Sequence, residues 1–185
     1  MSDGLTLQPP VPDLRTSRVL LRRPDTADVD RRLSIGRHRE IVEAYGGSFD
    51  PTGGFTRADA DAEIARITKE PFAWVIDVDG FIGHIRLHTL DRIDRRAVLA
   101  IGIEDPAYLG RGLGSEAIRL VLHYAFGSGL HRIGLRVLAT NTRAIASYLK
   151  CGFVVEGRER DACHLNGVWI DDVMMGILDR EFVVG

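Results

Sequence analysis

Three closely spaced glycines are the first residues in this chain whose pattern suggests a chemistry. The run is Gly110, Arg111, Gly112, Leu113, Gly114 and Ser115. Glycine has no Cβ, so its backbone can approach a ligand closely. The helix expected to open near Ser115 has first amides without intrahelical partners, and these carry partial positive charge. The run therefore predicts main-chain binding of a phosphate-bearing cofactor, with a plain turn between strand and helix as the alternative.

Two common phosphate-binding motifs do not fit this run. No Gly-Lys-Ser/Thr follows the glycines, which excludes a Walker loop. Gly112-x-Gly114-x-x-Ala117 satisfies the dinucleotide fingerprint, but that fingerprint also needs an acidic residue about 20 positions on. Residues 117–155 contain no Asp or Glu. The cations in the same segment are Arg119, Arg132, Arg136, Arg143 and Lys150. The segment therefore indicates an anionic ligand other than a dinucleotide.

The elements that lead to the glycine run are mostly strands. Residues 18–23 predict a first strand, and Asp25 is expected to cap a helix that carries Val29 and Leu33. Residues 46–54 are turn-rich, and Thr56 with Asp59 forms a capping-box pattern at the start of a helix that ends before Pro71. Residues 72–78, 81–88 and 97–103 then predict three antiparallel strands, the first two joined by a type I′ turn at Asp79-Gly80. One face of the second strand is expected to carry Phe81, Gly83, Ile85 and Leu87, and the other Ile82, His84, Arg86 and His88.

The elements after the glycine run predict a βαβ unit and a terminal hairpin. An apolar stripe marks a helix that ends near Gly127, and residues 132–138 form the next strand, so a right-handed crossover is expected. Asn141 or Thr142 caps a further helix through Lys150. Strand patterns at 153–156, 160–165 and 168–178 follow, with a hairpin signal at Asn166-Gly167. The predicted fold class is α+β, a mixed and mostly antiparallel sheet with helices on both faces.

The totals restrict the function classes. At 185 residues the chain suits one domain, and we expect a loose leader over residues 1–13 followed by a domain over 14–185. A net charge of −2 argues against a nucleic-acid-binding protein. Cys151 and Cys163 predict neither a disulfide framework nor a metal site. No secretory signal or membrane span is found, so a soluble cytoplasmic protein without membrane partners is expected.

Two motifs carry a family resemblance. The segment Leu109-Gly-Arg-Gly-Leu-Gly-Ser-Glu-Ala117 resembles the pyrophosphate loop of the GNAT superfamily of N-acetyltransferases, and within it the ribosomal-protein (Rim-type) branch. The segment from Asn141 to Phe153 resembles the family's Asn-x-x-Ala-Ile-x-x-Tyr-x-Lys-x-Gly-Phe almost position for position. Residues 14–18 and 166–171 also match, so the resemblance covers nearly the whole chain. It implies a sheet that splits between its fourth and fifth strands.

The resemblance further implies a site for acetyl-CoA with no metal. The backbone amides of residues 111–115 would hold the pyrophosphate, and the Arg111 side chain would add a charge. Ile101 and Ile103 would pair with the pantetheine amides, and Asn141 would contact the same arm. The cofactor residues that the resemblance implies are Ile101, Ile103, Gly110, Arg111, Gly112, Leu113, Gly114, Ser115, Asn141, Ala144 and Tyr148.

The same resemblance assigns Tyr148 as the acid that protonates the leaving thiolate, with a tyrosine packed in the core as the alternative. The family's frequent glutamate near the start of the fourth strand is replaced by Val98, so the general base stays open. The candidates are His84, Arg86, His88, Glu104 and ordered water.

The expected reaction is direct acetyl transfer to a primary amine. The acceptor stays open among a protein N-terminus, an amino acid, a polyamine and an aminoglycoside-like molecule, and the protein is expected to be a monomer or a homodimer. The alternative function is a non-catalytic module that binds or senses acyl-CoA.

Overall fold

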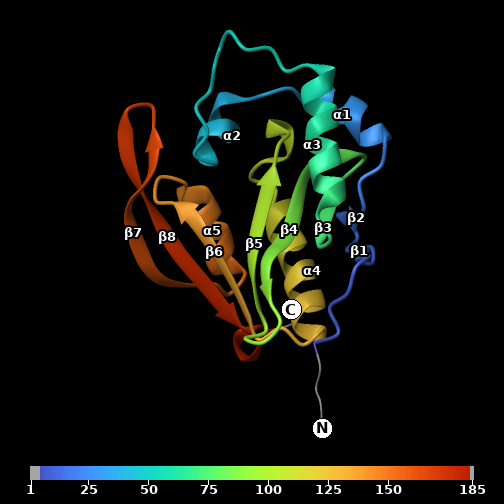
Figure 1. Ribbon diagram of the computed structural model, residues 1–185, viewed down its shortest axis with the longest axis vertical. Helices are drawn as coiled ribbons and strands as arrows, with labels where there is room; N and C mark the ends of the chain where they lie inside the picture. Colours follow the sequence, from blue (N-terminus) through green and yellow to red (C-terminus); the bar gives the residue numbers. More distant parts are fainter. Residues whose placement is uncertain (1–4, 184–185) are drawn as a thin grey trace.

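The predicted strands assemble into one mixed sheet. The computed structural model describes residues 5–183. Over this range eight strands lie in the order β1-β2-β3-β4-β5-β6-β8-β7, and helices cover both faces of the sheet (Figure 1). The strands are β1 (Leu14–Arg15), β2 (Leu20–Arg22), β3 (Ala73–Asp77), β4 (Phe81–Asp91), β5 (Arg96–Ile103), β6 (Arg132–Leu138), β7 (Val154–Leu165) and β8 (Val168–Leu178). The helices are α1 (Ala27–Ile35), α2 (Arg39–Ala44), α3 (Arg57–Lys69), α4 (Leu113–Gly127) and α5 (Thr142–Lys150), with single 3₁₀ turns η1 (Pro106–Tyr108) and η2 (Asp179–Glu181).

The sheet opens between β5 and β6. These strands run parallel, and within residues 5–183 they pair at Arg96↔Arg132, Ala97↔Ile133 and Val98↔Gly134. No rungs join them beyond Val98, and Figure 1 shows the two strands diverging toward the end where α2 lies. α4 connects them as the crossover helix. The predicted α+β class, the three antiparallel strands β3–β5, and the split between the fourth and fifth predicted strands are therefore confirmed.

Each face of the sheet has its own apolar core. The predicted stripe of α4 is buried against one face, and Trp74, Ile85 and Ile133 contribute from the strands. α1 and α3 cover Ala73, Val75 and Phe81 on the other face. Burying one such side chain stabilises the fold by about 1.5–3 kcal/mol. Both faces of β3 are therefore covered, and its residues 73–76 are buried.

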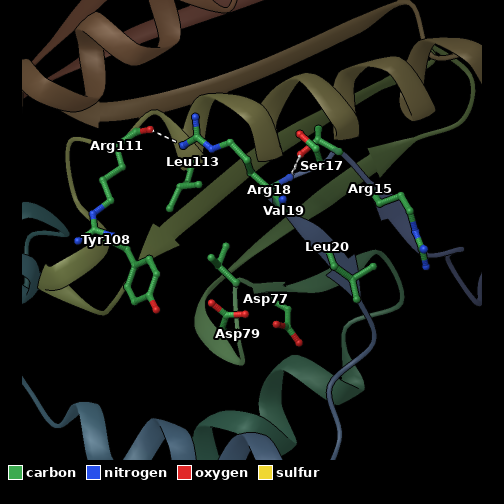
Figure 2. A pocket seen from close by; sticks show the side chains of 12 residues that line it. Arg15, Ser17, Arg18, Val19, Leu20, Asp77, Asp79, Tyr108, Arg111 and Leu113 are labelled. Atoms are coloured by element: carbon green, nitrogen blue, oxygen red, sulfur yellow. Dashed lines mark hydrogen bonds between the residues drawn. The ribbon is translucent and has the colours of Figure 1, made fainter.

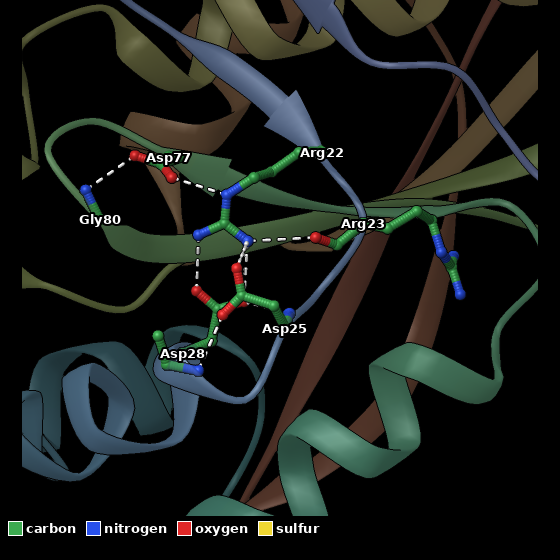
Figure 3. Close-up of polar contacts among 7 residues, drawn as sticks. Arg22, Arg23, Asp25, Asp28, Asp77 and Gly80 are labelled. Atoms are coloured by element: carbon green, nitrogen blue, oxygen red, sulfur yellow. Dashed lines mark hydrogen bonds and ion pairs between the residues drawn. The ribbon is translucent and has the colours of Figure 1, made fainter.

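A half-buried arginine fixes α1 to the sheet. Arg22 on β2 donates from Nη2 and Nη1 to the two carboxylate oxygens of Asp28, at 2.7 and 2.9 Å, and from Nε to Asp77 Oδ2 at 2.7 Å (Figure 3). Asp28 is only 1% exposed. The hydrogen bond to Asp28 is the main reason that the pKa of Arg22 is raised above its ordinary value. Arg32 follows Asp28 by four residues on α1, so both side chains share the helix face that turns toward the sheet.

Two expectations need correction. Residues 5–13 are not loose, because Leu7 and Val11 are buried in the first core and Trp74 Nε1 donates to the Pro12 carbonyl at 2.8 Å. Residues 1–4 of the expected leader lie outside the described part of the chain. The residues of β4 do not alternate regularly between the two faces of the sheet, because the β3–β4 register shifts by one residue between Ile76 and Asp77. This bulge sends Phe81 into the second core and Ile82 into the first.

The remaining differences concern short elements. α2 and the two-residue β1 are additional, and the patterns at 153–156 and 160–165 belong to a single irregular strand, β7. The expected caps at Thr56–Asp59 and Asn141 are present. None of the helices within residues 5–183 is long and apolar enough to cross a membrane.

Candidate active site

The glycine run places free amides at the start of α4. Gly110 and Gly112 adopt positive φ angles of 73° and 81°, a region that suits glycine. Gly112 is the N-cap and has no side chain to cap the helix. Within residues 5–183 no acceptor is found for the amides of Leu113, Gly114 and Ser115. These donors and the positive end of the helix therefore remain available to an anion.

The free edge of β5 faces the same opening. Glu104 N donates to Ile82 O at 2.8 Å, and the register continues with His84↔Gly102. Antiparallel pairing alternates the direction of the backbone groups. The N–H and C=O groups of Ile101 and Ile103 consequently point away from β4 and into the split.

A cavity of about 520 Å³ fills this opening. It is bounded by β5, the glycine run and α5. The sequence-predicted cofactor residues that line it are Ile101, Ile103, Gly110, Gly112, Leu113, Gly114, Ser115, Asn141, Ala144 and Tyr148. Arg119, Arg143 and Lys150, three of the cations counted in the acid-free segment, line it as well. The structure thus brings together most of the predicted set and adds three positive charges.

Arg111 is the predicted residue that does not line this cavity. Its guanidinium lies 5.2 Å from the centre of the Tyr108 ring, and its carbonyl accepts from Arg18 Nη2 at 2.6 Å. Arg111, Tyr108 and Arg18 line a second cavity of about 530 Å³. Figure 2 shows these residues around it. Arg18 also pairs with Glu116 at 3.1 Å. The Arg111 guanidinium therefore lies outside the cleft, contrary to the expectation that it adds a charge there.

Tyr148 and Asn141 reach the cleft from α5. Tyr148 is 8% exposed, stacks edge-on against Phe153 with ring centres 5.8 Å apart, and lines the cavity. Burial raises its pKa to about 12, so the hydroxyl is neutral at physiological pH. Asn141 caps α5 through Ala144 N at 3.1 Å and donates from Nδ2 to the Ala44 carbonyl at 3.3 Å. Asn141 therefore ties α5 to the end of α2.

Sequence reasoning missed Tyr45, which follows α2. Its hydroxyl donates to the Ile101 carbonyl at 3.1 Å, on the free edge of β5. A Cβ on Gly102 would lie 2.5 Å from this hydroxyl, so Tyr45 requires glycine at that position. The residue is 55% exposed, but its hydroxyl lies between β5 and the two cavities, where loss of water, followed by the charge of Glu104, raises the pKa of Tyr45. Tyr45 and Ile101 line both the cleft and a neighbouring cavity, which therefore adjoin at this point.

The neighbouring cavity, of about 490 Å³, lies on the α1/α3 side of the sheet. We call it the acceptor-side cavity. His84 on β4 and Glu104 at the end of β5 meet there, with His84 Nδ1 at 2.8 Å from Glu104 Oε1. Arg32 Nε lies 2.5 Å from Glu104 Oε2 and 3.1 Å from Glu63 Oε2. Glu63, His84 and Glu104 have the composition of a metal site, but the Arg32 guanidinium already bridges the two carboxylates as a cation would.

The pKa values of Glu63 and Glu104 are shifted in opposite directions. Burial acts to raise the pKa of Glu104, but the hydrogen bond and charge of His84, together with Arg32, bring it below the ordinary value. The pKa of Glu63 is raised, chiefly by burial and then by the charge of Glu104. The pKa shifts therefore favour the charged form of Glu104 more than that of Glu63, and Glu104 can orient His84.

The other base candidates are less suitable. Arg86 lines the acceptor-side cavity but forms an ion pair with Glu70. His88 lines neither cavity, and its Nδ1 contacts Thr89 Oγ1 at 2.9 Å. Cys151 is buried, which raises its pKa, so it lacks the thiolate that a nucleophile needs.

This arrangement agrees with the comparison to known families. The profile described as the acetyltransferase (GNAT) domain matches residues 18–154, which includes both cavities' strands and the glycine run. The chain belongs to the GNAT acetyltransferase family. The resemblance seen in the two sequence motifs is therefore confirmed at the level of the family.

Individual GNAT proteins resemble parts or all of the chain. The protein named probable N-acetyltransferase YjcK of Bacillus subtilis is 35% identical over 104 residues, 56% of this chain and 58% of that protein. The spermidine N(1)-acetyltransferase of Escherichia coli is 32% identical over 112 residues, 60% of each chain. These matches thus span little more than half of either relative. The crystal structure of spermidine N-acetyltransferase from Vibrio cholerae, in complex with CoA and spermine, superposes with a TM-score of 0.73 at 25% identity, covering 90% of this chain and 98% of that one.

Proposed function

We propose that the protein transfers an acetyl group from acetyl-CoA to a primary amine by direct attack. The observation that carries the proposal is the pair of adjoining cavities. One offers free amides and cations, and the other offers a buried histidine–carboxylate pair. Membership of the GNAT family supports the same reaction class. Crystal structures of similar fold in complex with CoA or acetyl-CoA support the choice of cofactor.

In this proposal acetyl-CoA occupies the split between β5 and β6. The amides of Leu113, Gly114 and Ser115 bind the pyrophosphate, and Arg119 and Lys150 line the phosphate end. The pantetheine arm pairs with the free edge of β5 at Ile101 and Ile103. Because the Tyr45 hydroxyl holds the Ile101 carbonyl, the cofactor must displace it. The Arg111 side chain takes no part in binding the pyrophosphate in this proposal.

The acceptor amine approaches from the acceptor-side cavity. Glu104 accepts from His84 Nδ1, which leaves Nε2 unprotonated in the neutral ring and able to take a proton. The amine attacks the thioester carbon after losing its proton, the carbonyl oxygen becomes negative, and a β5 amide stabilises it. Collapse of this tetrahedral intermediate breaks the C–S bond, and Tyr148 stabilises the leaving thiolate. A positioned base typically contributes about 10²- to 10⁴-fold.

Val98 lies on the same sheet face as Glu104, because residues 98, 100, 102 and 104 alternate along β5. The two positions are six residues apart, about 20 Å along the extended chain, so Glu104 offers a carboxylate at the other end of this face and does not replace an acid at 98. Glu104→Gln removes the charge but keeps the shape, and His84→Gln removes the proton acceptor. We expect both to lower kcat strongly near neutral pH, and to recover as rising pH deprotonates the free amine. His88→Gln, on the same strand outside both cavities, is the matched control.

The decisive experiment is a thiol-release assay with acetyl-CoA and a panel of amines, including a peptide N-terminus, amino acids, polyamines and an aminoglycoside. Amine-dependent release, with the acetylated product identified by mass, supports the enzyme. Tight CoA binding without release for any amine would instead support the alternative, a non-catalytic module that binds acyl-CoA.

A further inference from the structure

The charge of the acceptor-side cavity points to a particular class of acceptor. We propose that the acceptor carries an anionic group, a carboxylate or a phosphate, in addition to its primary amine. This inference rests on the proposed function, because it names the substrate class of the same site. It separates this chain from relatives whose names specify spermidine, which carries only positive charges.

The carboxylates that line the cavity are already paired with neighbouring side chains. The two lining carboxylates are Glu63 and Glu104. Arg32 pairs with both, at 3.1 and 2.5 Å, and His84 contacts Glu104 at 2.8 Å. The raised pKa of Glu63 weakens its charge further. An ammonium group entering the cavity therefore finds no uncommitted carboxylate among the lining residues.

The positive charges exceed the negative ones. The cavity is lined by four arginines, Arg32, Arg37, Arg66 and Arg86. Arg86 is paired with Glu70, and Arg32 bridges the two glutamates. Arg37 and Arg66 have no carboxylate within 4.0 Å among residues 5–183. From beyond that distance, the charge of Arg37 is a minor contribution to the lowered pKa of Asp59. Two cations thus remain for an external anion.

The two arginines without a carboxylate partner line different parts of the cavity wall. Arg66 is on α3, three residues after Glu63, or about 4.5 Å farther along the helix axis. Arg37 lies in the connection between α1 and α2, with its guanidinium 5.6 Å from the centre of the Phe55 ring just before α3. An acceptor with its amine at His84 can therefore present its other end to one of these arginines, and either would repel a second ammonium.

The test compares acceptors that differ only in the second group. 4-Aminobutyrate, 4-aminobutanamide and 1,4-diaminobutane carry the same primary amine and four-carbon chain, ending in an anion, a neutral amide and a cation. O-Phosphoethanolamine against ethanolamine distinguishes phosphate from carboxylate as the anion. Two readouts are used on the full chain saturated with CoA or acetyl-CoA: the rise in Tm on adding each probe, and kcat/KM in the thiol-release assay.

We expect both readouts to rank anionic above neutral above cationic probes. Arg66→Gln and Arg37→Gln should each lower the preference for the anionic probe by about fivefold, the scale of one solvent-screened charge pair. Lys69→Gln removes the same charge from the same helix outside the cavity, and should change nothing.

The other outcomes distinguish failure of the proposed function from failure of the inference about the acceptor's charge. If the Tm ranking holds but no probe is acetylated, the proposed function fails and the charge preference stands. A preference for the diamine overturns the inference, as does no Tm shift by any probe at tens of millimolar. It is also overturned if both arginine variants reduce turnover of all probes equally, since that result would show a structural role.

Discussion

Tyr148→Phe tests how the leaving thiolate is stabilised. Burial raises the pKa of Tyr148 to about 12, whereas an ordinary thiol has a pKa of about 8.5. Full proton transfer to the thiolate is then uphill by about 3.5 pKa units, or about 5 kcal/mol at 1.36 kcal/mol per unit. A hydrogen bond to the charged sulfur is worth about 1.5–3 kcal/mol and needs no transfer. We therefore expect Tyr148 to donate a hydrogen bond and retain its proton.

Loss of that bond should lower kcat by about 10- to 150-fold. The measurement is thiol release at saturating acetyl-CoA from pH 7 to 10, with the Kd for CoA measured in parallel. Because the folded pKa lies near 12, the hydroxyl stays neutral over this whole range. The ratio of wild-type to variant kcat should accordingly stay constant with pH. Tyr124→Phe removes a tyrosine hydroxyl outside both cavities and serves as the control.

Two results would refute this reasoning. A loss greater than about 10³-fold that fades above pH 9 would show that Tyr148 delivers its proton, since a free thiolate needs none at high pH. An unchanged kcat would instead leave Tyr148 as a packing residue beside Phe153. A higher Kd for CoA with normal kcat would confine its contribution to binding.

Three further outcomes follow from individual contacts. Tyr45→Phe removes the hydroxyl that competes for the Ile101 carbonyl, so CoA should bind about 2- to 10-fold more tightly by calorimetry; weaker binding would mean that Tyr45 holds the cofactor. Gly114→Ala has room in the free protein, since its Cβ would lie 3.8 Å from Ile103 Cγ1, and alanine favours the helix by about 1 kcal/mol. Its Tm should rise while CoA affinity falls about tenfold because the methyl enters the cleft; unchanged affinity would place the cofactor elsewhere. Asp28→Asn should lower the free energy of unfolding in urea by about 1.5–3 kcal/mol, because the buried side chain loses its charge-assisted hydrogen bonds from Arg22 while Asp77 still pairs with that arginine, whereas the exposed Asp30→Asn should cost less than about 1 kcal/mol; equal effects would contradict the argument.

Elements with strong periodicity were predictable from the sequence. The stripe of α4, the capping box at Thr56 and the hairpin signals at Asp79-Gly80 and Asn166-Gly167 are local patterns, and they need no tertiary information. α2 is six residues long and ends before Tyr45. A helix that short has little periodicity, and its position depends on bonds to distant residues such as Asn141. The bulge at Ile82 was hidden because Phe81 and Ile82 are both apolar, so neither residue type shows which face of the strand it occupies.

The cofactor side of the site was more predictable than the acceptor side. The glycine run and α5 are contiguous motifs, so their cleft-lining residues could be named in advance. His84 and Glu104 lie 20 residues apart and meet only through the β4–β5 register. The predicted pairing of those strands was a signal that could have placed them together. Arg32, Glu63 and Arg66 come from helices on the other face, whose packing no sequence pattern specifies.

The three rungs between β5 and β6 have a mechanical consequence. β6, β8, β7 and α5 form a wing that is joined to the rest of the sheet along a short seam. An extended arm bound along β5 adds rungs where that ladder stops, so the ligand acts as a temporary strand. The wing should therefore pivot more freely before loading and stiffen after it, with slower amide exchange along β5. Amide hydrogen exchange along β5 would therefore distinguish the loaded protein from the free protein.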